Sequence, residues 1–517
     1  MESVAITINE KVVGAKDKFE AEFNFRKMDT TMYKFPAGLK GMLEQSGYHS
    51  YVVPRFVAIG PYHKGVDELN NMAEVKAAAV YYLCELVELE PKAALEKMEA
   101  SEAVKEARGR YVVDVAMEAA EGAAAGSKDQ GSSFVAMMLC DACFLLLYMV
   151  AYTSSRGKKE NYHVNPSMRR FLFCNRDSIN NDIMLLENQL PWPVIQALMD
   201  LVREEHKTYL MTAVGEFIAG MGNEFKVSAV GGVASDDHPK NKPASVWEWD
   251  DQNDPPPHLL ALVRRYKTQG RRKQAALPAT TTAALGDDER RRPLLDTSNG
   301  YGRLKREKTT AAPPQAQEEE QDHRFTVMPT VPPMELEEIG IKLKGSQTAA
   351  FSDMGFVRGR FCSELSLAPL SLSDARASCL VNMAAFEVST ASRFGDDPDR
   401  TAVCSYLALL DMFMVREEDV HTLRSKGLLC GPQTDKEILT FFKTVGKHLP
   451  DTVSRFAIVM ENIHDYRRSR YIWIPMYKWV YNHYGSIVHV ASIVKVVSFF
   501  AALLGLYQAI LSLNKHD

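Results

Sequence analysis

The sequence predicts a mainly α-helical globular protein with a minor β hairpin or small sheet, a disordered central insert and a C-terminal transmembrane helix. The chain has 517 residues, of which 46% are hydrophobic and 25% charged, as is usual for proteins with a sizeable core. Apolar helical segments recur through most of its length, and an uncharged run lies near its carboxyl end. The 61 basic and 66 acidic side chains nearly balance, which argues against a surface built for nucleic acid.

The amino-terminal part of the main domain is predicted to span residues 31–267, after a loosely ordered stretch at residues 1–30. Within it, "YVVPRFVAIGPYHKG" (residues 51–65) predicts a short strand or extended segment followed by a Gly-Pro turn. Helical composition starts at Glu74, and Pro91 suits the first turn of a second helix.

The stretch from Ser132 to Tyr152 is apolar enough to compete as a membrane helix. Asp141 interrupts it, however, and the apolar run after this residue has only ten residues, so we expect a buried core helix. Cys140 and Cys143 form a CxxC pair inside this helix, without a second ligand pair for zinc. We therefore predict buried structural thiols.

The stretch "NDIMLLENQLPWPVIQAL" (residues 181–198) places Glu187, Asn188 and Gln189 between two apolar runs. We expect one helix to end there and Pro191 to help open the next. Because helix ends leave peptide groups unpaired, a carboxylate and two amides in a core can supply their missing partners. The triplet is predicted to be a structural tie, with contact to a ligand or partner and catalysis as the alternatives.

After an expected helix at His258–Lys267, residues 268–324 become charged and rich in Ala, Thr and Pro, which predicts a disordered insert. Order is expected to return over residues 325–485, the carboxyl part of the domain. The alternating segments "GIKLKG" and "GRFCSELSLAPLSL" predict the hairpin or small sheet, and Ser373-Asp374 resembles a helix cap. Further helices are predicted at residues 402–415, 417–425 and 435–448, before a long aromatic helix kinked at Pro475.

The stretch "RRYKTQGRRK" contains six basic residues in ten: Arg264, Arg265, Lys267, Arg271, Arg272 and Lys273. One interpretation is a solvated helix end that runs into a linker. The others are a nuclear signal, a nucleic-acid patch or a contact with anionic lipid. Among the binding interpretations lipid contact is favoured, because a membrane segment is predicted in the same chain and Tyr266 is the single aromatic residue in the cluster.

A single-pass membrane anchor is predicted over residues 486–513. Its core, Val496–Leu513, has 18 residues and no charge, and as a helix it would span roughly 27 Å, close to the hydrocarbon thickness of a bilayer. Basic residues are more frequent before it than after it, so the positive-inside rule puts the large domain in the cytosol of a tail-anchored protein. These residues are Arg467, Arg468, Arg470 and Lys478 before the run, and Lys515 and His516 after it.

No common catalytic signature is found: the sequence lacks the GxxxxGK[ST], HExxH and GxSxG patterns and a kinase catalytic loop. His63 in "GPYHKG" could be a general base, but the sequence offers no partner for it, and a packing or hydrogen-bonding role in a turn is expected. We therefore predict no enzyme, no cofactor, no metal and no small-molecule substrate.

Several stretches together resemble a plant family called domain of unknown function 247. They occur in order from about Tyr33 to the end, and include "DACFLLLYM", "IGIKLKG", "LVNMAAFE" and "SYLALLDMFMVREEDVHTLRSKGLL". The most distinctive blocks contain Pro54, Gly60, Pro61, Tyr62 and His63, and Glu187, Asn188, Gln189 and Pro191.

The resemblance implies a plant protein associated with a membrane through its carboxyl end, and no established enzymatic activity. Some relatives in grasses are linked to self-incompatibility as pollen-side recognition determinants, which implies partner recognition. Three hypotheses follow: a membrane-anchored protein with an unknown protein partner, a narrower self-recognition or signalling determinant, and an unrecognised enzyme that uses Glu187 or His63.

Overall fold

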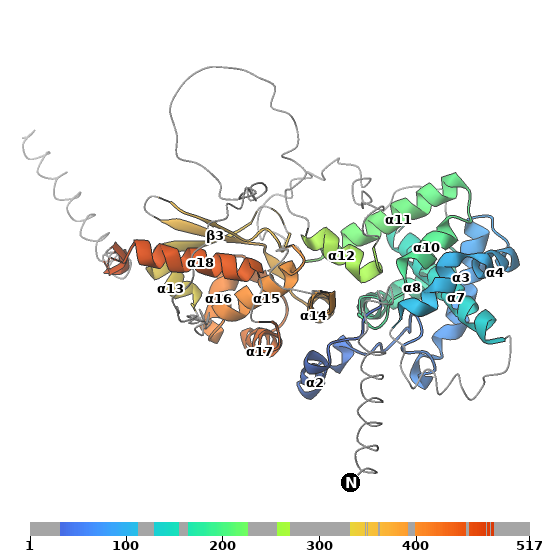
Figure 1. Cartoon of the computed structure of the whole chain (residues 1–517), viewed down its shortest axis with the longest axis horizontal. Helices are drawn as coiled ribbons and strands as arrows, with labels where there is room; N and C mark the ends of the chain where they lie inside the picture. Colours follow the sequence, from blue (N-terminus) through green and yellow to red (C-terminus); the bar gives the residue numbers. More distant parts are fainter. Residues whose placement is uncertain are drawn as a thin grey trace, which may run out of the picture.

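The computed structural model shows an elongated, mainly helical molecule (Figure 1). Helices from the first half of the sequence form one end, the sheet and the later helices form the other, and α12 and α14 lie between them. The described residues are 32–111, 129–154, 164–225, 256–268, 331–346, 348, 350–359, 362–390, 399–450, 454–471, 473–475 and 477–479.

The first end is built around α7 (Asp129–Ser154). Helices α3, α4, α10 and α11 all pack against it. Pro91 occupies the first turn of α4, as predicted, where a missing N–H costs nothing. The elements before α7 are α2 (Ala37–Gln45), η1 (His49–Tyr51), η2 (Asp67–Leu69), α3 (Met72–Leu86), α4 (Pro91–Ala100), α5 (Glu102–Ala107) and η3 (Arg108–Arg110).

Among the described residues, one helical stretch, Phe134–Thr153, is long and apolar enough to cross a membrane. It belongs to α7, and 78% of its most apolar window is buried inside the protein. A helix that is apolar on every side and covered by other helices is a core helix, as predicted from Asp141. The predicted anchor, residues 486–513, lies outside the described residues.

In the described residues, the helices that follow α7 in the first half are α8 (Pro166–Cys174), α9 (Arg176–Asp182), α10 (Trp192–Met199), α11 (Glu204–Asn223) and α12 (Leu259–Thr268). The prediction of one helix ending near the Glu187–Gln189 triplet is wrong in its bounds. Helix α8 ends at Cys174, and the side-chain amide of the next residue, Asn175, donates to the carbonyl of Phe171 at 2.9 Å. Helix α9 ends at Asp182, five residues before Glu187. Pro191 directly precedes α10, as predicted.

The second end contains a three-stranded sheet of order β1-β3-β2. Strand β1 (Ile341–Gly345) runs parallel to β3 (Ser363–Leu367), and β2 (Gly355–Val357) runs antiparallel to β3. The small sheet expected from "GIKLKG" and "GRFCSELSL" is therefore confirmed. Helix α13 (Pro333–Glu338) precedes the sheet, and two short parallel strands, β4 (Leu370–Ser371) and β5 (Leu429–Cys430), pair separately.

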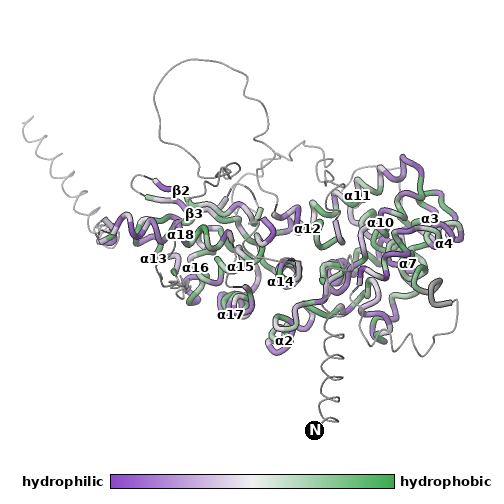
Figure 2. The backbone as a smooth tube through the Cα atoms, in the orientation of Figure 1, coloured by the Kyte–Doolittle hydropathy of each residue, from purple (hydrophilic) through white to green (hydrophobic). Residues whose placement is uncertain are grey.

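The remaining helices are α14 (Asp374–Thr390), α15 (Ala402–Phe413), α16 (Glu417–Ser425), α17 (Asp435–Gly446) and α18 (Ser454–Ser469). Ser373 accepts the N–H of Arg376 at 3.4 Å, so it caps α14 as expected. Helix α18 ends at Ser469, before the predicted kink at Pro475. Figure 2 shows most helices alternating between hydrophilic and hydrophobic residues, which is typical of helices with one face in a core.

Contacts between distant parts of the sequence join the two ends. Helix α14 packs against α9 and η1, and α17 packs against α2. The N–H of Phe351 also bonds to the carbonyl of Lys267 at 2.7 Å, across the predicted insert at residues 268–324. Apart from Thr268, that insert lies outside the described residues.

Candidate functional site

The segment 54–63 is irregular, although an extended segment or strand was predicted there. Its peptide groups bond to buried side chains instead of to a neighbouring strand. The carboxylate of Asp182 accepts the N–H groups of Arg55, Phe56 and Val57, at 3.1, 2.6 and 2.9 Å. Such hydrogen bonds favour the ionised carboxylate, whereas burial of Asp182 has the larger effect and raises its pKa.

The next peptide N–H groups of the segment 54–63 donate to the side chains of Asn188 and Asp141. Asn188 accepts the N–H of Ile59 at 2.7 Å and donates to the carbonyls of Val57 and Asp182, both at 2.9 Å. Asp141, from the middle of α7, accepts the N–H of Gly60 at 2.8 Å. We call Asp141, Asp182, Glu187, Asn188 and Gln189 the polar tie, because their side chains hold separate segments together.

Lys76 on α3 forms an ion pair with Asp141, one of the buried carboxylates of the polar tie. Its ammonium lies 2.6 Å from Asp141, which is 1% exposed, and it also donates to the carbonyl of Ala58. Burial raises the pKa of Asp141, and the charge and hydrogen bond of Lys76 oppose this shift. The pair connects α3, α7 and the segment 54–63, so its position is that of a structural ion pair.

Glu187 and Gln189 fasten further parts of the chain. Glu187 accepts the N–H of Phe35 at 2.8 Å and lies 3.4 Å from the ammonium of Lys40. Gln189 donates to the carbonyls of Ile183 and Leu185 at 2.7 and 2.8 Å, and its oxygen accepts the N–H of Leu260 at 3.1 Å. The triplet thus bonds to backbone groups, which is the geometry expected of a structural tie.

The structure also places the remaining residues of the first distinctive block. Pro54 and Pro61 are buried, and the hydroxyl of Tyr62 donates to the carbonyl of Met32 at 2.7 Å. His63 is 9% exposed, and its Nε2 has no hydrogen-bond partner among the described residues. Burial lowers the pKa of His63, with Glu187 and Lys40 acting in opposite directions.

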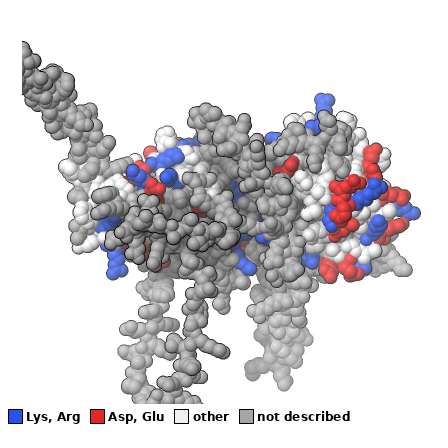
Figure 3. Space-filling view, turned by 90° about the horizontal axis from the view of Figure 1, so that it is seen from above, with Lys and Arg blue, Asp and Glu red and all other residues white. Residues whose placement is uncertain are grey.

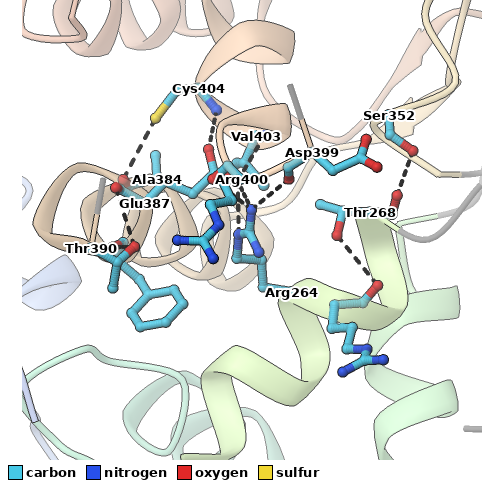
Figure 4. A network of polar contacts seen from close by, with 12 residues as sticks. Arg264, Thr268, Ser352, Ala384, Glu387, Thr390, Asp399, Arg400, Val403 and Cys404 are labelled. Carbon is cyan, nitrogen blue, oxygen red and sulfur yellow. Dashed lines mark hydrogen bonds and ion pairs between the residues drawn. The ribbon is translucent and has the colours of Figure 1, made fainter. Parts of the chain in front are cut away.

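The described residues of the basic cluster, Arg264, Arg265 and Lys267, are buried or half-buried. The Arg264 guanidinium reaches from α12 to Glu387 on α14 at 2.7 Å and donates to the carbonyls of Asp399 and Arg400 (Figure 4). Glu387 has no exposed surface and also accepts two N–H groups of α15, those of Val403 and Cys404. Lipid contact is therefore wrong for Arg264.

Lys267 is buried as well, with 2% of its surface exposed. Its ammonium lies over the rings of Phe225 and Phe351, 5.2 and 4.4 Å from their centroids, where cation–π attraction replaces part of the lost hydration. Lipid contact is wrong for this residue too. Arg265 is half-buried, and Arg271, Arg272 and Lys273 lie outside the described residues.

The two CxxC thiols lie inside α7, with Cys143 buried and Cys140 half-buried. A hydrogen bond with Cys84 and burial raise the pKa of Cys143 well above its usual value. Burial also raises the pKa of Cys140. A thiol with a raised pKa is a poor nucleophile and metal ligand, which fits packing residues. The described residues contain no group of three His, Cys, Asp or Glu side chains that could hold a metal ion.

An open cleft of about 570 Å³ lies where the first and second halves meet. It is bordered by η1, α9, the end of α11 and the start of α14, so both halves contribute walls. Its charged lining consists of Arg55, Arg176, Arg376, Asp177, Asp182, Glu224 and Asp374. We call it the junction cleft. His63 does not line this cleft, and it does not line the cavities of about 720 and 800 Å³ elsewhere in the described residues.

Several of the charges in the junction cleft are committed to internal bonds. Asp182 holds the segment 54–63, Asp374 accepts the hydroxyl of Tyr51 at 2.7 Å, and Arg376 donates to Ser371 at 2.6 Å. In contrast, no described residue pairs with the guanidinium of Arg55, and the guanidinium of Arg176 lies 3.4 Å from the carboxylate of its exposed neighbour Asp177. Sequence reasoning missed this cleft, because its walls come from residues far apart in the chain.

The fold and its buried polar tie define a mainly helical protein in which small sheets support one end. The chain belongs to the DUF247 family, described as plant protein of unknown function, whose model matches residues 32–506. Comparisons with curated proteins and with solved structures gave no significant match.

Proposed function

We propose that this plant protein is anchored in a membrane by residues 486–513 and acts in the cytosol by binding a protein partner, without catalysis. The anchor rests on the uncharged run Val496–Leu513, and the orientation rests on the excess of basic residues before it.

The observation that carries partner binding is the junction cleft. Small-molecule pockets are mostly apolar with a few polar groups, whereas this cleft presents charges of both signs around an open hollow. Polar rims and arginine side chains are typical of protein interfaces. Arg55 and Arg176 are exposed there, so a partner segment with acidic side chains could pair with them.

A non-catalytic role is supported by what the candidate catalytic groups do in this fold. Glu187 bonds to the peptide N–H of Phe35 and to the ammonium of Lys40. His63 is buried outside the cavities described above. A purified protein that converts a substrate, and loses this activity in the His63→Ala variant, would contradict the proposal.

Proximity labelling of the full-length protein in plant cells tests partner binding. We expect a protein that is labelled by the wild type and lost in the Arg55→Glu/Arg176→Glu variant. A matched control is Lys105→Glu on α5, a side chain that is 53% exposed and far from the cleft in sequence. If the wild type and the cleft variant label the same proteins equally, the partner does not bind at the junction cleft.

The anchor is tested separately by removing residues 486–517 from a fluorescent fusion. We expect the truncated fusion to leave the membrane fraction, and the full-length protein to resist extraction by alkaline carbonate. Release of the full-length protein by carbonate would contradict the anchor. Protease protection of the large domain in sealed microsomes would contradict the cytosolic orientation.

A further inference from the structure

Exposed hydrophobic side chains gather at the end of the molecule that contains the sheet and α18. Nine large hydrophobic residues are exposed among the described ones, and six of them lie on α13, β2, α18 or the residues that follow α18. These six are Met334, Val357, Ile458, Tyr471, Trp473 and Trp479, with exposed fractions of 54, 64, 47, 71, 61 and 57%.

Ion pairs bring the elements that carry most of these residues together. Arg467 lies 3.1 Å from Glu335, which is next to Met334, and Lys478 lies 2.6 Å from Glu338. Arg358, next to Val357, lies 3.7 Å from Asp465 of α18. The residues Met334, Val357, Tyr471, Trp473 and Trp479 therefore surround one end of α18, and we call them the apolar end.

The segment after α18 is held in place, so its aromatic side chains have a defined position. The hydroxyl of Tyr466 donates to the carbonyl of Ile339 at 3.1 Å, and Tyr477 contacts the thiol of Cys362 at 3.4 Å. These contacts attach α18 and the residues after it to the segments that directly precede β1 and β3, while Trp473 and Trp479 stay exposed.

We infer that the apolar end lies on the interface of the phospholipid bilayer that holds the anchor. Tyrosine and tryptophan are enriched at this depth, because their rings favour the acyl boundary while their polar atoms stay hydrated. Trp479 precedes the uncharged run Val496–Leu513 by 17 residues, so the apolar end is near the membrane if the anchor inserts. This inference rests on the proposed anchoring and adds an orientation to it.

The distribution of charge agrees with this orientation. Figure 3 shows a group of acidic side chains, with basic ones among them, at the opposite end of the molecule, over α3 and α4, and less acidic surface at the α18 end. Arg468 is exposed at the apolar end, and no described residue pairs with it. Anionic lipids attract such a cation and repel the acidic end, so the long axis would point away from the bilayer.

Fluorescence quenching by brominated phosphatidylcholine tests the inference on the full-length protein in vesicles that also contain phosphatidylserine. The chain has five tryptophans, and Trp192 is 1% exposed. We expect bromine on the acyl chains to quench the wild type, and more than half of this quenching to disappear in Trp473→Phe/Trp479→Phe. The Trp247→Phe/Trp249→Phe variant is the control and should keep it.

The outcomes separate the inference from the anchor. If carbonate releases the full-length protein, the proposed anchoring fails. If the protein resists carbonate but both double variants are quenched like the wild type, the anchor stands and the bilayer contact is overturned. Protection of Trp473 and Trp479 from acrylamide in a detergent-solubilised dimer, without lipid quenching, would instead assign the apolar end to a second copy of the chain.

Discussion

The guanidinium of Arg264 lies 2.7 Å from the carboxylate of Glu387, which has no exposed surface and belongs to a helix 123 residues further along the chain. This pair joins α12 to α14. Glu387 also accepts two peptide N–H groups of α15, so the same carboxylate links three helices. The side chains therefore link helices on both sides of the predicted insert.

Removing this guanidinium should destabilise the protein strongly. Arg264→Ala leaves a buried carboxylate without its counter-charge, so we expect the free energy of unfolding to fall by about 3–5 kcal/mol in a denaturant titration. Replacing both partners by apolar residues of similar volume should recover part of the loss. The control Arg176→Ala removes an exposed contact with Asp177 and should change little; equal losses in both variants would contradict a buried pair.

Asn188 should be among the least replaceable residues of the polar tie. Asn188→Ala removes the acceptor for the buried N–H of Ile59 and the side-chain donor to the carbonyl of Val57, and we expect a loss of about 3 kcal/mol in the free energy of unfolding. Asn70 is an exposed asparagine with a single 3.3 Å bond to Asp67, and its alanine variant is the matched control. A stable Asn188→Ala protein would show that the segment 54–63 is held by other contacts.

Two variants of Glu187 distinguish a structural role of this residue from a role in partner binding. Glu187→Ala should lower the free energy of unfolding by about 1–3 kcal/mol, because the buried N–H of Phe35 loses its acceptor. Glu187→Gln keeps an acceptor oxygen and should cost less. A Glu187→Ala protein that unfolds like wild type but loses its partner in proximity labelling would make this residue a binding contact.

Gly60 and Gly65 both have left-handed backbone conformations, but only Gly60 has close neighbours. Their alanine variants therefore compare backbone strain alone with strain plus a steric clash. A Cβ at Gly60 (φ 72°) would lie 2.7 Å from the carbonyl oxygen of Gln189 and 2.9 Å from the hydroxyl of Tyr111, whereas one at Gly65 (φ 86°) would meet nothing within 4 Å. We expect Gly65→Ala to cost about 1 kcal/mol from backbone strain alone. Gly60→Ala should cost about 2–5 kcal/mol, because overpacking is added. Equal thermal shifts would contradict the contact.

His258 should make the stability fall as the solution becomes acidic. Burial lowers its pKa to about 3, and its Nδ1 accepts the N–H of Ala261 at 3.3 Å, which requires an unprotonated nitrogen. Between the unfolded-state pKa of about 6.5 and the folded value, the unfolded chain binds a proton that the folded chain excludes. Stability should therefore drop with falling pH, by up to about 1.4 kcal/mol per pH unit from this residue.

The variant His258→Asn tests whether His258 causes this pH dependence, because asparagine can still accept the N–H of Ala261 but does not titrate. We expect its free energy of unfolding, measured from pH 7 to pH 5, to depend less on pH than that of wild type. His421→Asn, at a side chain that is 77% exposed, is the control. An unchanged pH dependence in His258→Asn would assign the acid sensitivity to other groups.

Local signals in the sequence predicted many helices well. The bounds of α16, Glu417–Ser425, agree with the prediction, and Asp419 caps its first turn by accepting the N–H of Arg416 at 2.8 Å. Such caps act within four residues, so they are visible in a short stretch of sequence. The same applies to Pro91 in α4 and Ser373 before α14.

Long-range contacts explain what the sequence could not show. A short strand or extended segment was predicted for residues 51–65, but the N–H groups of Val57 and Ile59 find their acceptors in Asp182 and Asn188, more than 120 residues away. Likewise, the basic cluster at Arg264 is typical of a surface, and only the packing of α14 brings Glu387 to it. The polarity of the Glu187 triplet inside an apolar run predicts a tie, but a short stretch of sequence does not show its partners Phe35 and Leu260.

The hydrogen bond between Tyr51 and Asp374 has a consequence for biosynthesis. The two residues are 323 positions apart, and Asn382 bonds to the Tyr51 carbonyl over 331 positions. At about 5–20 residues per second, a ribosome needs roughly 16–65 s to reach Asp374 after Tyr51. During this time the first segment lacks the surface on which it packs, so the nascent chain should depend on chaperones for that interval, and ribosome stalling before Asp374 should leave it open to proteolysis.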